Sequence, residues 1–187
     1  MAKATARIFD EYLAAAARSG DREAFARLAE RWQPKLAAHA YRLLGDAEGA
    51  RDVVQDAWAD IIKGLAGLDD VRVFPAWAYR IVTRRVADAI RRRQRDRRTS
   101  AAYAAEKQTD AANAVLSDAS LDAQPLSAAI GALPPDQRSA IALFYMEDFS
   151  VAEVAAALNV PAGTVKTRLM HARRKLRAAL EGDESHG

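Results

Sequence analysis

Apolar residues recur at intervals of three and four along nearly every long segment of this 187-residue chain. That interval is the period of an α-helix, and no run of alternating apolar and polar residues reaches strand length. The sequence therefore predicts an all-α protein. Turn and cap signals divide it into helices at residues 6–18, 21–44, 47–66, 75–97, 126–131, 136–146, 151–158 and 162–180.

The stretch 99–125 differs from the rest of the chain because it is rich in Ala, Ser, Asp and Asn and lacks a wide apolar stripe. We interpret it as a flexible linker between two small helical domains, at residues 6–98 and 126–181. A second interpretation is an exposed, Ala-rich helix over residues 101–116.

Composition narrows the function classes. The chain has no cysteine, which excludes disulfides and thiolate zinc sites, and its three histidines are far apart in the sequence. We expect no metal, no cofactor and no catalytic residue. No segment resembles a secretory signal or a membrane span, so we expect a cytoplasmic protein without membrane insertion. Residues 1–98 hold 20 basic and 14 acidic side chains, so positive charge is concentrated in the N-terminal half.

Residues 150–177 have the pattern of a helix-turn-helix. Ser150 and Glu153 form a capping box, and Asn159-Val160-Pro161 ends the first helix and begins the second. No acidic residue occurs between Thr164 and Leu180, whereas basic residues stand at Lys166, Arg168, Arg173, Arg174, Lys175 and Arg177. A solvated face usually mixes both signs, so we interpret this face as a DNA contact. The alternative is an ordinary amphipathic helix.

The predicted helix 47–66 carries a ridge of carboxylates at a spacing of four residues: Glu48, Asp52, Asp56 and Asp60. Like charges at this spacing destabilise a helix by a few tenths of a kcal/mol per pair. Two interpretations remain open, a solvated acidic face and a docking surface for a basic partner.

The predicted helix 75–97 has the opposite charge. Its apolar stripe faces away from a ridge formed by Trp77, Arg80, Arg84, Asp88, Arg91 and Arg95. Guanidinium groups hold phosphates and an aromatic ring stacks bases, so this ridge is suited to single-stranded nucleic acid. Taken alone, a tryptophan at the position of Trp77 is more often part of the core than a base platform. We expect Asp88, four residues after Arg84, to orient the Arg84 guanidinium.

The enzyme alternative is a small nuclease that holds magnesium on the acidic ridge. The sequence has no Gly-rich phosphate loop, no His-Glu-x-x-His motif and no nucleophile beside a base, and nothing marks a pocket. The nuclease alternative predicts DNA cleavage that depends on divalent metal.

Four motifs in this order resemble a bacterial RNA polymerase sigma factor of the extracytoplasmic-function group. GDREAFARLAERW at 20–32 resembles the start of sigma region 2, and RLLGDAEGARDVVQDAW at 42–58 the segment that docks on the β′ clamp helices of core polymerase. FPAWAYRIVTRRVADAIRRR at 74–93 is similar to the segment that melts and reads the −10 promoter element. Residues 132–176 resemble region 4, which reads the −35 element.

The resemblance implies a role for each feature. Asp52, Gln55 and Asp56 would bind core polymerase. The −10 surface would comprise Trp77, Arg80, Arg84, Asp88 and Arg91, and the −35 surface Thr164, Lys166, Thr167, Arg168, His171 and Arg174. The implied partners are core RNA polymerase (β′ clamp helices and β subunit), promoter DNA and an anti-sigma factor. The linker would thread toward the RNA exit path.

One residue departs from the family pattern: many members have Asn where this chain has Arg84, which changes the expected −10 preference. The alternatives from another class are a helix-turn-helix regulator that acts without polymerase and a sigma mimic that binds only an anti-sigma factor. A repressor has no use for the acidic ridge, and a mimic has no use for basic DNA-reading helices.

Overall fold

The computed structural model describes residues 2–103 and 124–183, with side chains for 5–97 and 126–181. Every regular element in these ranges is helical, so the prediction of an all-α fold is confirmed. The first group comprises α1 (Ala2–Arg18), α2 (Arg22–Leu44), α3 (Ala47–Leu65), the 3₁₀ turn η1 (Val71–Val73) and α4 (Phe74–Tyr103). The second comprises α5 (Gln124–Gly131), α6 (Pro135–Ile141), the π-helical turn η3 (Ala142–Met146), α7 (Val151–Leu158) and α8 (Ala162–Asp183).

Helix boundaries follow the cap signals of the sequence. The Asp21 carboxylate accepts hydrogen bonds from the backbone N–H groups of Glu23 and Ala24, and Asp46 accepts one from Glu48. Gly45 ends α2 in the left-handed conformation, with φ of 68°. The Ser150–Glu153 capping box forms as predicted, and Asn159 ends α7 with φ of 53°.

The end of α4 and the segment 136–146 differ most from the prediction. Helix α4 continues to Tyr103, so the first residues of the predicted linker are helical, as their high alanine content allows. The predicted helix 136–146 divides at Ala142, where η3 follows α6 and the Glu147 N–H donates to the Ala142 carbonyl. Residues 104–123, which include most of the alternative helix 101–116, lie outside the described part of the chain.

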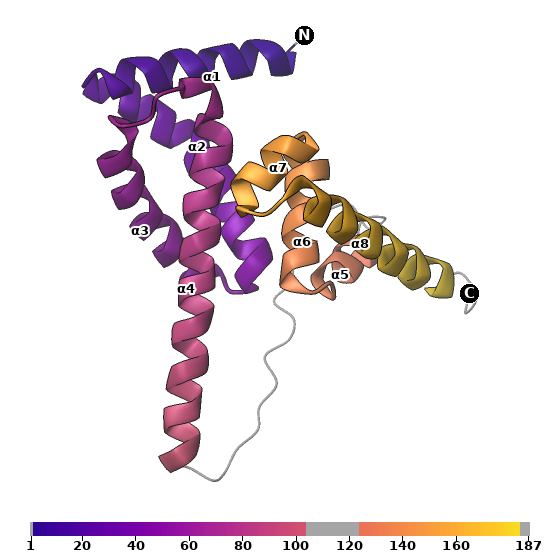
Figure 1. The fold of residues 1–187 in the computed structure, drawn as a ribbon. Helices are drawn as coiled ribbons and strands as arrows, with labels where there is room; N and C mark the ends of the chain where they lie inside the picture. The colour runs from indigo at the N-terminus through magenta and orange to yellow at the C-terminus, as the bar shows by residue number, and fades with distance from the viewer. Residues whose placement is uncertain (1, 104–123, 184–187) are drawn as a thin grey trace.

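The N-terminal core lies where α2, α3 and α4 meet, with α1 lying across one end (Figure 1). Fully buried side chains from each helix fill it, among them Leu28, Leu36, Val54, Ile61, Tyr79 and Val82. Trp32 packs edge-on against Phe74 and Tyr79, with ring centroids 5.3 and 5.9 Å away. Burial of such rings contributes most of the apolar area of a small domain, so these aromatics hold α2 to α4.

The C-terminal domain has a smaller core between α6, α7 and α8. Leu143 of η3 is buried there together with Val154, Val165 and Leu169 of the predicted helix-turn-helix. The two domains also touch each other. Helix α7 packs on α4 and α6 packs on α2, so the chain forms one continuous body (Figure 1). In the described part of the chain, no helix is both long and apolar enough to cross a membrane.

His39 lies in the N-terminal core, fully buried on α2. Its Nε2 is 3.0 Å from the Thr83 hydroxyl, and its ring packs edge-on against Tyr79. Burial, and next the charge of Arg42, lower the pKa of His39 to about 3. The imidazole is therefore neutral in the folded protein at physiological pH.

This burial predicts a pH-dependent stability. The folded pKa of about 3 is below the ordinary value of 6.5, so the unfolded chain binds the proton preferentially, and stability falls as pH drops below 6.5. Between pH 7 and 5.5 we expect this residue to reduce the free energy of unfolding by about 1 kcal/mol. Urea unfolding should show a weaker pH dependence in His39→Gln. Equal slopes in both proteins would contradict the assignment.

Candidate nucleic-acid interface

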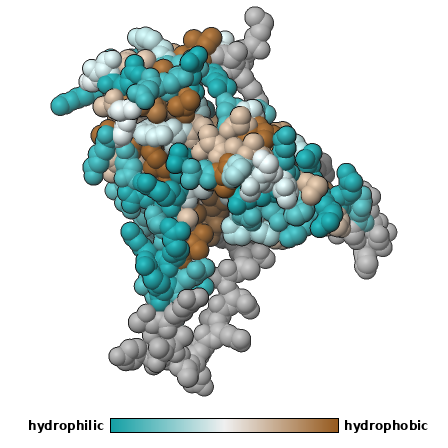
Figure 2. All heavy atoms as spheres, viewed as in Figure 1, coloured by the Kyte–Doolittle hydropathy of each residue, from teal (hydrophilic) through white to brown (hydrophobic). Residues whose placement is uncertain are grey.

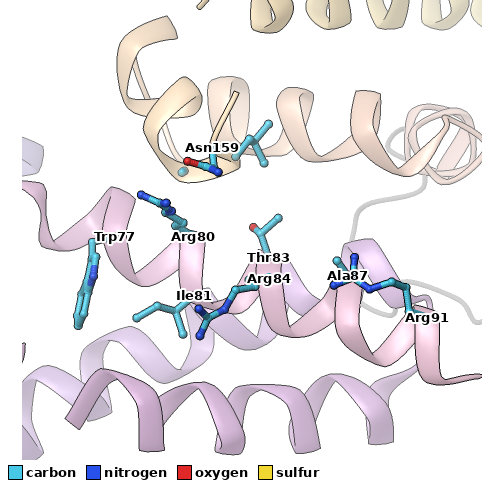
Figure 3. A pocket seen from close by; sticks show the side chains of 10 residues that line it. Trp77, Arg80, Ile81, Thr83, Arg84, Ala87, Arg91 and Asn159 are labelled. Atoms are coloured by element: carbon cyan, nitrogen blue, oxygen red, sulfur yellow. The ribbon is translucent and has the colours of Figure 1, made fainter. Parts of the chain in front are cut away.

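Helix α4 lines a cleft of about 640 Å³ that also includes the end of α7. Three arginines, Arg80, Arg84 and Arg91, line it together with Trp77, Ile81, Thr83, Ala87, Ala157, Leu158 and Asn159. Figure 3 shows Arg80 extending toward Asn159, whereas Arg84 lies on the side of α4 that faces α3. Four of the five residues predicted for the −10 surface therefore share one cleft.

Asp88, the fifth, lies outside that cleft, and the expectation that it orients Arg84 is wrong. Arg84 Nη2 donates to Asp60 Oδ2 on α3 at 3.2 Å, and Asp88 instead accepts from Arg91. Arg85, which sequence analysis did not select, donates twice to the same Asp60 carboxylate at 2.6 and 2.8 Å. Asp60 of the neighbouring helix thus binds both arginines, Arg85 through a bidentate pair and Arg84 through a single hydrogen bond.

The Asp60 carboxylate is therefore a junction between α3 and α4. The hydrogen bond from Arg85 is the largest of the effects that lower the pKa of Asp60, with a smaller contribution from Arg84. Because this carboxylate remains ionised, it fixes Arg84 at the edge of the cleft. The charge of Asp60 is therefore unavailable to an outside partner.

Trp77 is half-buried, so its environment is intermediate between that of a core residue and that of an exposed base platform. Its ring lies 6.2 Å from that of Phe74, and a Cβ added to Gly64 would come within 2.8 Å of the indole. Gly64 on α3 thus provides the space into which the ring packs. One edge of the indole still reaches the cleft, so both interpretations from the sequence describe part of its environment.

The carboxylates of the acidic ridge differ in their contacts along α3. Asp60 is bound to arginines, and the Asp56 carboxylate lies 3.9 Å from Arg85 Nη1 while remaining well exposed. Within the described residues, no ion pair joins Glu48 or Asp52, and both are exposed together with Gln55. The three residues that the sequence predicts for polymerase binding therefore share an accessible surface at the start and middle of α3.

A shallow groove of about 230 Å³ separates this surface from α4. Asp52 and Asp56 line one side, and Arg85, Arg92 and Arg93 line the other with Asp88. Arg93 also bonds to the α3 cap Asp46, and this hydrogen bond lowers the pKa of Asp46. Gly49 leaves room for this pairing, because a Cβ there would overlap the Arg93 guanidinium.

Helix α8 presents the predicted basic face. Lys166, Thr167, Arg173, Arg174 and Lys175 are exposed, and Thr164 and His171 are partly exposed. Arg168 differs, because its Nε lies 3.3 Å from Asp136 and only 24% of its side chain is accessible. The Thr167 hydroxyl bonds to the Gly163 carbonyl of its own helix. Arg168 thus connects α8 to α6, while its neighbours remain available.

Comparison with known proteins bears on both domains. The Sigma-70 region 2 model matches residues 28–96, and the Sigma-70 region 4 model matches residues 123–176. The ECF RNA polymerase sigma factor SigW of Bacillus subtilis is 30% identical over 172 residues, which cover 87% of this chain and 92% of that protein. The ECF sigma-E factor of Escherichia coli is 30% identical over 179 residues, 89% and 92% of the two chains.

The chain belongs to the ECF group of RNA polymerase sigma factors.

Two solved structures share the fold of this one. The sigma factor RpoE of Bartonella quintana, in complex with the anti-sigma factor NepR, has a TM-score of 0.69 and 27% identity, covering 84% of this chain and 96% of its own. CnrH, in complex with the cytosolic domain of CnrY, has a TM-score of 0.67 and 29% identity, covering 94% and 99%. Each likeness spans most of both chains.

Sequence reasoning missed the residues that connect elements. Sequence analysis assigned no particular partner to Arg85 or Arg93, although Arg85 binds Asp60 of α3 and Arg93 binds its N-cap Asp46. Tyr79 was not selected, and it is fully buried beneath the contact between the domains. A tyrosine adjacent to the apolar stripe of α4 is the only signal that could have marked this position.

Proposed function

We propose that this sigma factor docks on core RNA polymerase through Asp52, Gln55 and Asp56, opens the −10 element with α4 and reads the −35 element with α8. The observation that carries the proposal is the separation of charge over three helices. Exposed carboxylates remain on α3, arginines line a cleft beside α4, and α8 presents basic side chains to solvent. Figure 2 shows hydrophilic side chains over much of the surface around these helices.

Each surface suits its proposed partner physically. Arginine offers five donors in a planar group, so Arg80 and Arg91 can hold phosphates while the exposed edge of Trp77 meets a base. A helix with exposed Lys and Arg at successive turns suits the major groove of duplex DNA. Bond formation belongs to the polymerase, and this subunit provides recognition and strand opening. An anti-sigma factor as a further partner is supported by the RpoE–NepR complex.

The docking surface predicts a specific loss of polymerase binding. Asp52→Lys combined with Asp56→Lys should abolish co-purification with core polymerase, because it reverses the charge of an exposed face. The fold should persist, because exposed charges of this kind contribute little to stability. Glu30→Lys, a single charge reversal on an exposed face of α2, should leave binding intact. Unchanged binding in the double variant would overturn the docking assignment.

Variants of α8 should separate into two classes. Arg174→Ala should weaken binding to all promoters alike. It should also reduce the slope of log binding constant against log salt concentration by about 0.9, as expected for the loss of one phosphate contact. Lys166→Ala or His171→Ala should reduce affinity by about 1–3 kcal/mol at a single −35 position and relax the preference there. A library of −35 variants measures this, and uniform losses for Lys166 and His171 would contradict base reading.

Arg84 should act on strand opening more than on base choice, because a guanidinium offers only donors and a planar face. Permanganate footprinting, which reports unpaired thymines, should show slower opening in Arg84→Ala with −35 binding retained. Arg84→Asn, the common family residue, should alter −10 preference instead. Asp60→Asn keeps Arg84 but removes its anchor, so we expect an intermediate defect. Normal opening in Arg84→Ala would show that this residue only covers α3.

A further inference from the structure

Two adjacent arginines of α4, Arg84 and Arg85, share the Asp60 carboxylate of α3, and they bind it unequally. Arg85 donates from Nε to Oδ2 at 2.8 Å and from Nη2 to Oδ1 at 2.6 Å, so it occupies both oxygens. Arg84 makes a single contact, from Nη2 to Oδ2 at 3.2 Å. A planar guanidinium matches a carboxylate best through two parallel hydrogen bonds, so Arg85 holds the favoured position and Arg84 a secondary one.

The accessibility of the two guanidinium groups differs accordingly. The Arg85 side chain is 27% accessible, whereas 66% of the Arg84 side chain is accessible. The hydrogen bond to Asp60 is the largest of the effects that raise the pKa of Arg85. Against the opposing effect of burial, the charges of Asp60, Asp56 and Asp88 raise it further. Arg84 thus remains largely accessible beside the cleft, because Arg85 has taken the carboxylate that both residues reach.

Arg85 also extends toward the docking surface. Its Nη1 lies 3.9 Å from Oδ2 of Asp56, which stands one turn before Asp60 on α3. This separation is too long for a hydrogen bond, so the attraction is electrostatic alone. It offsets part of the Asp56 charge that a basic partner would meet. The three nitrogens of one guanidinium group therefore act on two carboxylates, one used within the domain and one in the proposed docking surface.

We propose that Arg85 is a positioning residue for the surfaces on either side of it, because it keeps Arg84 available to the melted strand and offsets charge at Asp56. This inference rests on the proposed functions of Arg84 and Asp56. Without Arg85, both oxygens of Asp60 would be open to Arg84, which already lies on the side of α4 that faces α3 (Figure 3). Arg84 would then form the bidentate pair itself and be drawn away from the strand.

Removal of Arg85 should therefore change two activities in opposite directions. Strand opening should slow because Arg84 is withdrawn, whereas docking on polymerase should strengthen because Asp56 loses a neighbouring cation. A general loss of folding would weaken both activities. The two effects also depend on different properties of Arg85, since opening needs its planar pair of donors and docking responds to its charge alone.

Arg85→Met and Arg85→Lys separate these properties in the full-length chain. With saturating core polymerase, permanganate footprinting should show opening about tenfold slower in Arg85→Met, the loss expected for one charged hydrogen bond. Affinity for core polymerase should rise by about two- to fivefold at low salt, the range of exposed ion pairs. Lysine keeps the charge but lacks the planar fork, so Arg85→Lys should dock as wild type does and show a smaller defect in opening.

A matched control removes the same charge from another position of α4. Arg97→Met, at an exposed position further along the helix, should change neither polymerase affinity nor the rate of opening. Circular dichroism and thermal unfolding should show that each variant is folded under the conditions of the two assays.

Two double variants test whether Arg85 acts through Arg84. In an Arg84→Ala chain, adding Arg85→Met should not slow opening further, because no guanidinium is left to withdraw. Adding Asp60→Asn to Arg85→Met should accelerate opening to the level of Asp60→Asn alone, because a neutral amide holds Arg84 less strongly than a carboxylate. Additive losses in both double variants would instead show that Arg85 only stabilises the domain, and would overturn the proposal.

Nitrogen-15 NMR of the arginine side chains follows the rearrangement in the free protein, without polymerase or DNA. In wild type the Nε–H of Arg85, which donates to Asp60, should exchange slowly with water, and that of Arg84 quickly. In Arg85→Met the Nε–H of Arg84 should become slow to exchange, because Arg84 has taken over the bidentate position.

Three results would each count against the proposal. Arg84 exchange that is equal in wild type and Arg85→Met would overturn it, as would normal opening in Arg85→Met when Arg84→Ala opens slowly. Weaker docking in Arg85→Met would overturn the assigned effect on Asp56. Failure of the proposed function gives a different pattern. If no variant bound core polymerase or opened a promoter, the promoter role would be wrong, whereas slowed exchange at Arg84 would still show that Arg85 keeps it from Asp60.

Discussion

Helix α4 must satisfy opposite demands on its different sides, and the rest of the structure is arranged around this constraint. One side buries Phe74, Tyr79, Val82 and Val86 against α2 and α3. The other sides carry arginines that would repel one another if nothing compensated them. Carboxylates at both ends of α3 supply that compensation, through Asp46 to Arg93 and Asp60 to Arg84 and Arg85. The acidic helix thereby holds the basic helix in place.

This arrangement gives the acidic ridge two roles according to position. Asp60, near the C-terminal end of α3, is used within the domain, and its lowered pKa reflects the arginines that bind it. Asp52 lies two turns earlier, is exposed, and has no ion pair within the described residues. A single periodic pattern of carboxylates thus contains both a structural contact and a candidate docking surface, and only the neighbouring helix distinguishes them.

The sequence predicted the helices well because apolar periodicity and caps act within one element. The stripe Val165, Leu169 and Ala172 of α8 is buried as expected, and Ser150 begins α7. Periodicity carries no information on pairs between helices. It assigned Asp88 to Arg84 on spacing alone, whereas Asp60 of α3 is the actual partner. For the same reason the sequence could not place Arg168 on Asp136.

The contact between the domains was beyond sequence reasoning, because isolated residues such as Tyr79, Glu147 and Phe149 have no repeating signal. Its composition nevertheless suits a reversible state. The Arg42–Glu147 ion pair, the Tyr79–Phe149 ring contact and the hydrogen bond from Arg138 to the Arg42 backbone carbonyl resemble the polar interfaces of mobile domains more than a permanent core.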